Sequence, residues 1–347
     1  MVYKFNLMYI NLSDSYRLAS KLTLKRLNNA WQVYSSFQKS RKTKDPQIKG
    51  LPISISIEPT TACNLRCPEC PSGLRSFTRP TGNLNPNHFY RLIDEIGDTL
   101  SYLIFYFQGE PYLHKHLHEM IQYASDRGIY TATSTNAHFL NEDTAIKTIG
   151  SGLDRLIISI DGATQETYES YRKEGKLDKV LEGTKNIVSA KKALRKKHPH
   201  ILWQFLVVRP NEHEIPQIKE MAKQYGVDQL GFKTAQIYDY EFGNNLIPTI
   251  EKYARYHQLD NGKYAIKNAI ENECWRMWHS CVITWDGRVV PCCFDKDAQH
   301  VFGNTTTESF KEIWHSEAYS AFRNTLLHSR EDIEMCKNCT EGTKVWA

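Results

Sequence analysis

Residues 53–70 read ISISIEPTTACNLRCPEC, an alternating run followed at once by three cysteines spaced CxxxCxxC. The alternation of isoleucine and serine predicts a β-strand with one buried face. Cys63, Cys67 and Cys70 then fall in the loop at the carboxyl end of this strand, where three thiolates can converge. This arrangement favours metal ligation.

Similar β-rich runs recur along the next part of the chain, at 102–107, 129–133, 155–160, 201–208 and 229–233. Helical patterns separate them, at 86–99, 116–127, 141–149, 178–195 and 212–225. This alternation predicts an α/β fold with parallel strands. Because a closed (β/α)₈ barrel has eight strands and about 250 residues, we expect a partial, TIM-like (β/α)₆ barrel.

Two flanking regions break the alternation. Residues 1–50 are polar and basic, and an amphipathic helix is predicted from about 13 to 37, packed on the outside of the fold rather than on a membrane surface. Its apolar positions are Tyr16, Leu22, Leu27, Ala30, Trp31 and Tyr34. The last hundred residues gain cysteine and tryptophan, with a hairpin predicted at Asp286-Gly287 and helices at 307–315 and 317–328. The predicted parts are an N-terminal helical extension (1–50), the barrel (51–245) and a small cysteine-rich lobe (246–347).

The composition excludes several classes of protein. At 41% hydrophobic and 24% charged residues, the chain is typical of soluble globular proteins, and a net charge of +5 gives no reason to infer nucleic-acid binding. The longest apolar run, 102–107, is far too short to be a transmembrane segment. No secretory signal is apparent, so a cytoplasmic location is expected, and there nine cysteines favour metal binding over disulfides.

The cysteine triplet lacks a nearby fourth ligand, since the closest histidine is His88. A cluster with one open corner is therefore implied, although a zinc site completed from a distant residue is the alternative. The second β-rich run ends in a turn formed by Gly109, Glu110 and Pro111.

The triplet after a first strand and GEP after a second resemble the radical S-adenosylmethionine (SAM) superfamily. In that family three cysteines hold a 4Fe-4S cluster, and SAM chelates the fourth iron through its amino and carboxylate groups. One electron from the cluster splits SAM into methionine and a 5'-deoxyadenosyl radical, which abstracts hydrogen from substrate. The chain departs from the family pattern at Gln108, in place of a glycine, and at Glu69, where an aromatic or apolar residue is usual.

The resemblance also implies contacts to SAM. Gly109, Glu110 and Pro111 would face its ammonium group, because a carboxylate and backbone carbonyls accept hydrogen bonds from a cation. Ser159 and Asp161, at the end of the fourth run, and Asn136, after the third, would contact the ribose or the carboxylate. The GEP segment could instead be an ordinary strand-ending turn, and Asp161, before Gly162, could be only a turn residue. No general acid or base is identified.

The C-terminal cysteines follow C-x12-G-x4-C with a later CxxC, formed by Cys274, Gly287, Cys292, Cys336 and Cys339. This region resembles the extension called SPASM, or its shorter twitch form, which binds auxiliary 4Fe-4S clusters. Only six cysteines follow residue 270, so we expect one auxiliary cluster, held by Cys274, Cys292, Cys336 and Cys339. Cys293 would point away from its neighbour, and Cys281 is a buried thiol or a replacement for Cys274. A zinc knuckle is the alternative.

The resemblance implies an enzyme that cleaves SAM reductively and abstracts hydrogen from an unknown substrate, a peptide, a sugar or another small metabolite. The auxiliary cluster would transfer electrons, and a reductant such as flavodoxin or ferredoxin would supply them. The competing hypothesis is a non-catalytic iron-sulfur or zinc-binding protein for electron transfer or scaffolding.

Overall fold

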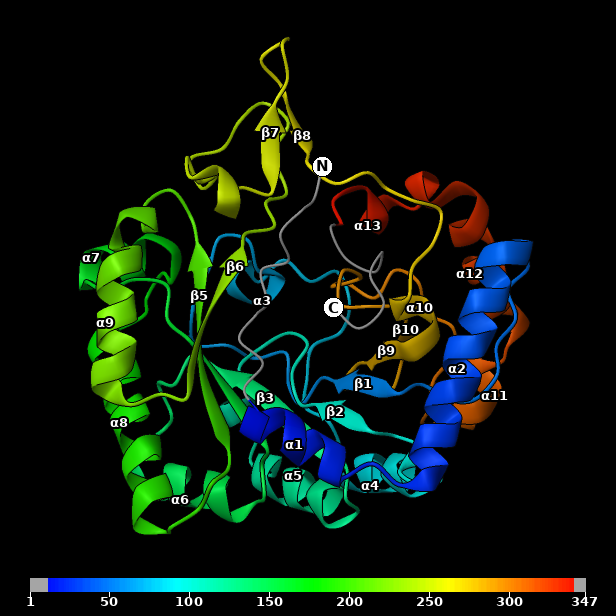
Figure 1. Cartoon of the computed structure of the whole chain (residues 1–347), viewed down its shortest axis with the longest axis horizontal. Coiled ribbons are helices and arrows are strands. Elements are labelled where there is room, and N and C mark those ends of the chain that lie inside the picture. The colour runs from blue at the N-terminus through cyan, green and yellow to red at the C-terminus, as the bar shows by residue number, and fades with distance from the viewer. Residues whose placement is uncertain (1–11, 340–347) are drawn as a thin grey trace.

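The computed structural model describes residues 12–339, and its centre is one eight-stranded sheet of order β10-β9-β1-β2-β3-β4-β5-β6 (Figure 1). Six of these strands are β1 (Ser54–Ile57), β2 (Tyr102–Ile104), β3 (Tyr130–Thr135), β4 (Arg155–Ser159), β5 (His200–Val207) and β6 (Gln229–Thr234). Each pairs in parallel with the next. The predicted partial barrel is therefore confirmed.

Helices between the strands cover the outer face of the sheet (Figure 1). They are α4 (Pro86–Ile96), α5 (Leu117–Asp126), α6 (Glu142–Gly150), α7 (Gln165–Tyr171), α8 (Leu177–Ala193) and α9 (Ile215–Tyr225). The connections also contain the short helices α3 (Pro71–Leu74), η1 (Pro111–Leu113) and η2 (Glu212–Glu214). Helix α4 shows why they form: Asn85 caps its N-terminus, and Phe89, Leu92 and Ile96 recur at helical spacing on its buried face. Helix α7 was not predicted.

The C-terminal hairpin extends the barrel sheet. Its strands β9 (Ser280–Ile283) and β10 (Val289–Val290) turn as predicted at Asp286-Gly287, and Gly287 has φ +86°. Strand β9 pairs in parallel with β1. Periodicity could not predict this contact, because it joins segments more than two hundred residues apart in sequence.

The rest of the C-terminal region carries short elements. They are η3 (Glu251–Tyr253), β7 (Tyr256–Gln258), β8 (Tyr264–Ile266), α10 (Arg276–His279), α11 (Phe310–Trp314), α12 (Glu317–Ser329), η4 (Arg330–Asp332) and α13 (Glu334–Lys337). Strands β7 and β8, which were not predicted, form a separate antiparallel pair beyond the carboxyl ends of β5 and β6 (Figure 1). The predicted helices at 307–315 and 317–328 correspond to α11 and α12.

The N-terminal region differs from the prediction in two ways. It forms two helices, α1 (Leu12–Ser20) and α2 (Leu24–Thr43), and Thr23 caps the second by accepting from the Arg26 amide. The predicted apolar face is wrong, since Tyr16 is 76% and Trp31 is 64% exposed. Buried polar side chains make the contact instead: Arg26 donates to the carbonyls of Gly97 and Arg127, both at 2.9 Å. Loop carbonyls at this end of the barrel need such donors.

Helix α2 also packs against the C-terminal lobe. The Phe37 ring lies 5.1 Å from that of Trp275 and 5.3 Å from that of Trp278. A second hydrophobic core therefore joins the two ends of the described chain. Within residues 12–339, every helix is too short or too polar to cross a membrane.

Candidate functional site

The three cysteines of the first motif line one cavity of about 150 Å³ at the carboxyl ends of the parallel strands. Its lining includes Cys63, Leu65, Cys67, Cys70, Gly73, Tyr106, Gly109, Glu110, Ser134, Thr135, Asn136, Ser159, Tyr171 and Arg172. All three thiols are free. Burial raises the pKa of Cys63 to about 12 and also raises that of Cys67, so a metal bound to these two sulfurs would favour their thiolate forms.

The GEP turn is packed directly against the cysteine loop. Gly109 has φ +74°, and a Cβ there would lie 2.2 Å from the Thr60 carbonyl oxygen, so only glycine fits. The Glu110 amide donates to the Ala62 carbonyl at 2.8 Å. Pro111 is buried at the start of η1 and is not among the residues that line the cavity.

The Glu110 carboxylate is already engaged by the protein. It accepts from the Thr135 hydroxyl at 2.7 Å, the Asn136 amide at 2.8 Å and the Tyr112 amide at 3.2 Å. Burial raises the pKa of Glu110 to about 6. Since a carboxylate offers roughly four acceptor positions, little capacity is left for a ligand, and the main effect of Glu110 is to join the ends of β2 and β3.

Asp161 lies behind the cavity instead of lining it. Its buried carboxylate pairs with the Arg172 guanidinium and accepts from the Leu206 amide at 2.8 Å. Arg172 lines the cavity, with Nη1 3.8 Å from the Cys67 sulfur. Sequence reasoning missed Arg172, because it follows the unpredicted helix α7 and belongs to no motif.

The second cysteine set gathers around a buried arginine. Arg330 is 1% exposed, and its Nη2 lies 3.6 Å from the Cys339 sulfur. The positive charge of Arg330 also acts on Cys274 and Cys336, while Cys292 lies close enough to Cys274 and Cys339 for their charges to interact. Such a cation offsets part of the negative charge of a thiolate-bound cluster.

The two remaining cysteines differ in burial, and the charge of Cys293 acts on its neighbour Cys292. Cys281 is a core side chain of β9, opposite Ile55 of β1. Cys293 is exposed, and its charge acts on Lys296.

A buried ion pair connects the two cysteine sets. Glu58, at the end of β1, accepts from Arg79 in two hydrogen bonds of 2.6 and 2.8 Å, and both side chains are almost fully buried. Glu58 also accepts from the Trp285 amide at 3.2 Å, and Arg79 Nε donates to the Lys296 carbonyl at 3.2 Å. The loop between the cysteine triplet and α4 is thereby fixed to the C-terminal lobe.

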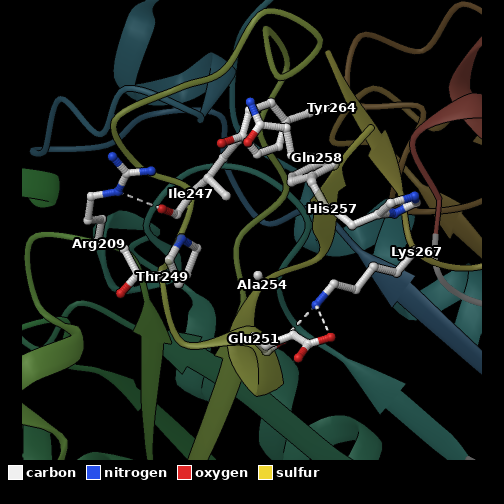
Figure 2. Close-up of a pocket in the computed structure, with 11 residues that line it drawn as sticks. Arg209, Ile247, Thr249, Glu251, Ala254, His257, Gln258, Tyr264 and Lys267 are labelled. Atoms are coloured by element: carbon white, nitrogen blue, oxygen red, sulfur yellow. Dashed lines mark hydrogen bonds and ion pairs between the residues drawn. The ribbon is translucent and has the colours of Figure 1, made fainter. Parts of the chain in front are cut away.

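A separate cavity of about 320 Å³ lies between the loop after β5 and the β7–β8 pair (Figure 2). In this cavity Arg209 donates to the Ile247 carbonyl at 2.9 Å, and Lys267 pairs with Glu251 at 3.9 Å. Because these charged groups are engaged with the protein, the cysteine-lined cavity is the stronger candidate for the reaction site.

The cysteine sets fit iron-sulfur clusters better than zinc. Among residues 12–339, no three histidine, cysteine or acidic side chains are arranged around a single metal ion. A 4Fe-4S cluster instead takes one cysteine per iron, so its ligands stand further apart. Three cysteines beside a cavity would leave a fourth iron free to take another ligand, and four cysteines would complete a second cluster.

Comparison with known families agrees with this geometry. Residues 57–222 match the model of the radical SAM superfamily, and residues 274–340 match SPASM, an iron-sulfur cluster-binding domain. The chain belongs to the radical SAM superfamily. It is accordingly a radical SAM enzyme, whose cofactors are SAM with a 4Fe-4S cluster in the barrel and an auxiliary iron-sulfur cluster in the SPASM domain.

Several proteins of known activity are similar to this radical SAM enzyme. The AdoMet-dependent heme synthase of Methanosarcina barkeri is 30% identical over 50% of the chain, a match that spans 48% of that protein. The PqqA peptide cyclase of Bradyrhizobium diazoefficiens is 25% identical over 84% of the chain and 79% of its own length. The tungsten-containing aldehyde ferredoxin oxidoreductase cofactor-modifying protein of Pyrococcus furiosus is 24% identical over 82% of the chain and 88% of its own length.

The fold is shared with SuiB of Streptococcus suis, solved bound to S-adenosylmethionine. The two align with a TM-score of 0.63 at 12% identity, over 89% of this chain and 76% of SuiB. SuiB has also been solved bound to its precursor peptide SuiA, with a TM-score of 0.60 to this chain.

Proposed function

We propose that Cys63, Cys67 and Cys70 hold the catalytic 4Fe-4S cluster and that SAM binds in the cavity they line. When bound, these cofactors supply a 5'-deoxyadenosyl radical that abstracts hydrogen from a substrate. The observation that carries the proposal is the meeting of three free cysteines with Gly109, Glu110, Asn136 and Ser159 around one cavity.

The polar groups of this cavity have separate tasks. The backbone at Gly109 faces the SAM ammonium, and Asn136 and Ser159 offer hydrogen-bonding groups to the ribose or carboxylate. Arg172 attracts the SAM carboxylate and offsets the thiolate charge near Cys67. Glu110 and Asp161 act indirectly, because they orient the Asn136 amide and Arg172 respectively.

We assign the auxiliary cluster to Cys274, Cys292, Cys336 and Cys339. The auxiliary cluster, held by the same chain as the radical site, would transfer electrons to or from the substrate. A flavodoxin or ferredoxin would reduce the catalytic cluster. Within this scheme the barrel comprises residues 51–245 and the auxiliary lobe 246–347, with residues 1–50 as an N-terminal extension. The enzyme acts in the cytoplasm.

The substrate is a peptide or a smaller metabolite. Similarity to a PqqA peptide cyclase along most of the chain, and the fold shared with peptide-bound SuiB, support a peptide. Similarity to a heme synthase supports a small molecule, but over a shorter stretch. We favour a peptide.

Anaerobic reconstitution tests the proposed function. We expect about eight irons per chain, the content of two 4Fe-4S clusters, and 5'-deoxyadenosine that forms only with SAM and a strong reductant. Cys67→Ala should abolish 5'-deoxyadenosine, whereas Cys336→Ala should lose about four irons yet still cleave SAM. Zinc in place of iron, or no 5'-deoxyadenosine from the wild-type protein, would support the non-catalytic alternative.

A further inference from the structure

Two positively charged side chains near the end of β6, Arg255 and Lys296, form no ion pair with a carboxylate of residues 12–339. Arg255 has its Nε and Nη1 atoms buried, and neither finds an acceptor among the described residues. Its remaining nitrogen, Nη2, makes only a long contact of 3.5 Å to the Thr234 carbonyl. Buried donors without acceptors are costly, and among the described arginines Arg255 alone has two such nitrogens, so a ligand that accepts from them would be favoured here.

Lys296 is the second of these cations. Its ammonium lies 4.6 Å from the centre of the Tyr238 ring, and the Tyr238 amide donates to Glu69, the neighbour of Cys70, at 2.9 Å. Burial lowers the pKa of Lys296, the nearby Arg255 lowers it further, and Cys70, Cys293 and Glu69 oppose this effect. Lys296 thus lies near Cys70 of the first set and near Cys293, the chain neighbour of Cys292 in the second set.

Arg255 and Lys296 contact the end of β6 and the loop that follows it, at Thr234 and Tyr238 respectively. Ala254 and Tyr256 line the cavity of Figure 2, and Arg255 does not. The Lys296 main chain is held in turn by its carbonyl contact with Arg79.

We infer that Arg255 and Lys296 bind a carboxylate of the substrate and hold it between the catalytic and auxiliary cysteines. This inference rests on the proposed function and narrows its substrate to molecules that carry a carboxylate. A planar carboxylate can accept from Arg255 and pair with Lys296 at the same time. The carboxylate can belong to a free acid or to an acidic side chain of a peptide.

Calorimetric titration of the anaerobically reconstituted protein, with SAM present, tests the inference. The free-acid arm compares glutarate with glutaramide, and the peptide arm compares a capped tripeptide containing glutamate with its glutamine counterpart. Wild-type protein should bind the carboxylate form of at least one pair roughly tenfold more tightly than the amide form, as expected for a charge-assisted hydrogen bond. The arm that shows the preference identifies the source.

Arg255→Gln and Lys296→Gln should each remove most of that preference. The control Lys263→Gln removes a cation of the β7–β8 hairpin that is already paired with Glu241, and it should leave the preference for the carboxylate intact. Equal binding of acid and amide by the wild-type protein, an unchanged preference in both variants, or tighter binding of inorganic phosphate than of either carboxylate would overturn the inference. Wild-type 5'-deoxyadenosine formation, measured in parallel, shows whether the proposed function itself stands.

Discussion

Replacing Arg79 with methionine should destabilise the protein strongly. The change removes two charge-assisted hydrogen bonds, of 2.6 and 2.8 Å, and leaves the Glu58 carboxylate buried without a cation. At about 1.5 to 3 kcal/mol per bond, and in line with broken buried ion pairs, the free energy of unfolding should fall by about 3 to 5 kcal/mol at neutral pH. Urea unfolding followed by tryptophan fluorescence measures this.

Two further variants distinguish ion pairing from side-chain size. Arg127→Met removes a comparable side chain from an exposed pair with Asp94 and should cost less than about 1 kcal/mol. Glu58→Gln combined with Arg79→Met should recover part of the loss, because no charge remains buried. If Arg79→Met costs no more than Arg127→Met, the ion pair does not hold the two cysteine regions together.

The pH dependence of the Arg79→Met variant gives an independent check. Burial already raises the pKa of Glu58 in the wild-type protein, and loss of the arginine raises it further. A carboxyl whose folded-state pKa lies above its unfolded value favours folding at low pH, and this contribution is lost as the pH rises through the folded pKa. The stability deficit of Arg79→Met should therefore shrink on acidification.

Three other changes have defined outcomes. Gly109→Ala should weaken SAM binding and lower the free energy of unfolding by well over about 1 kcal/mol. The control Gly128→Ala has a similar positive φ, but the nearest atom to its added Cβ is 3.5 Å away, so it should cost only about 1 kcal/mol. Equal losses in the two variants would contradict the close approach at the GEP turn. Burial, aided by a nearby arginine, lowers the pKa of His279 to about 3 in the folded protein, compared with about 6.5 in the unfolded chain. The neutral histidine therefore stabilises the fold above about pH 6.5, and this stabilisation is lost on acidification. Between pH 7 and pH 5, the free energy of unfolding of the wild-type protein should fall by about 2 kcal/mol more than that of His279→Asn. The same pH dependence of stability in both proteins would refute this. Cys281→Ala should retain the full iron content while Cys274→Ala loses about four irons per chain, and iron loss in the first variant would make Cys281 a ligand.

Local patterns predicted the barrel because each of its units is encoded within a short window. The runs at 102–107 and 155–160 alternate or cluster apolar residues, and the cysteine and GEP loops follow at fixed positions after them. The polar residues at strand ends were found because parallel strands bring their carboxyl ends to one edge of the sheet.

The remainder depended on contacts that no short window contains. Arg172 reaches the cavity only because Asp161 and the fold of α7 place it there. The N-terminal helices were assigned the wrong face because Arg26 is buried by satisfying carbonyl groups of distant loops. Arg255 and Lys296 lie in segments without periodic pattern, so only the three-dimensional structure shows that both contact β6 or the loop after it.

The pairing of β1 with β9 has a consequence for the order of assembly in the cell. One edge of β1 stays open until residues 280–283 have left the ribosome, and contacts so distant in sequence are slow to form. The cysteine loop that follows β1 is therefore completed only near the end of synthesis. A nascent chain or a truncation at residue 245 presents an open strand edge beside three reactive thiols, a combination prone to aggregation. We expect cluster insertion to follow release of the full chain.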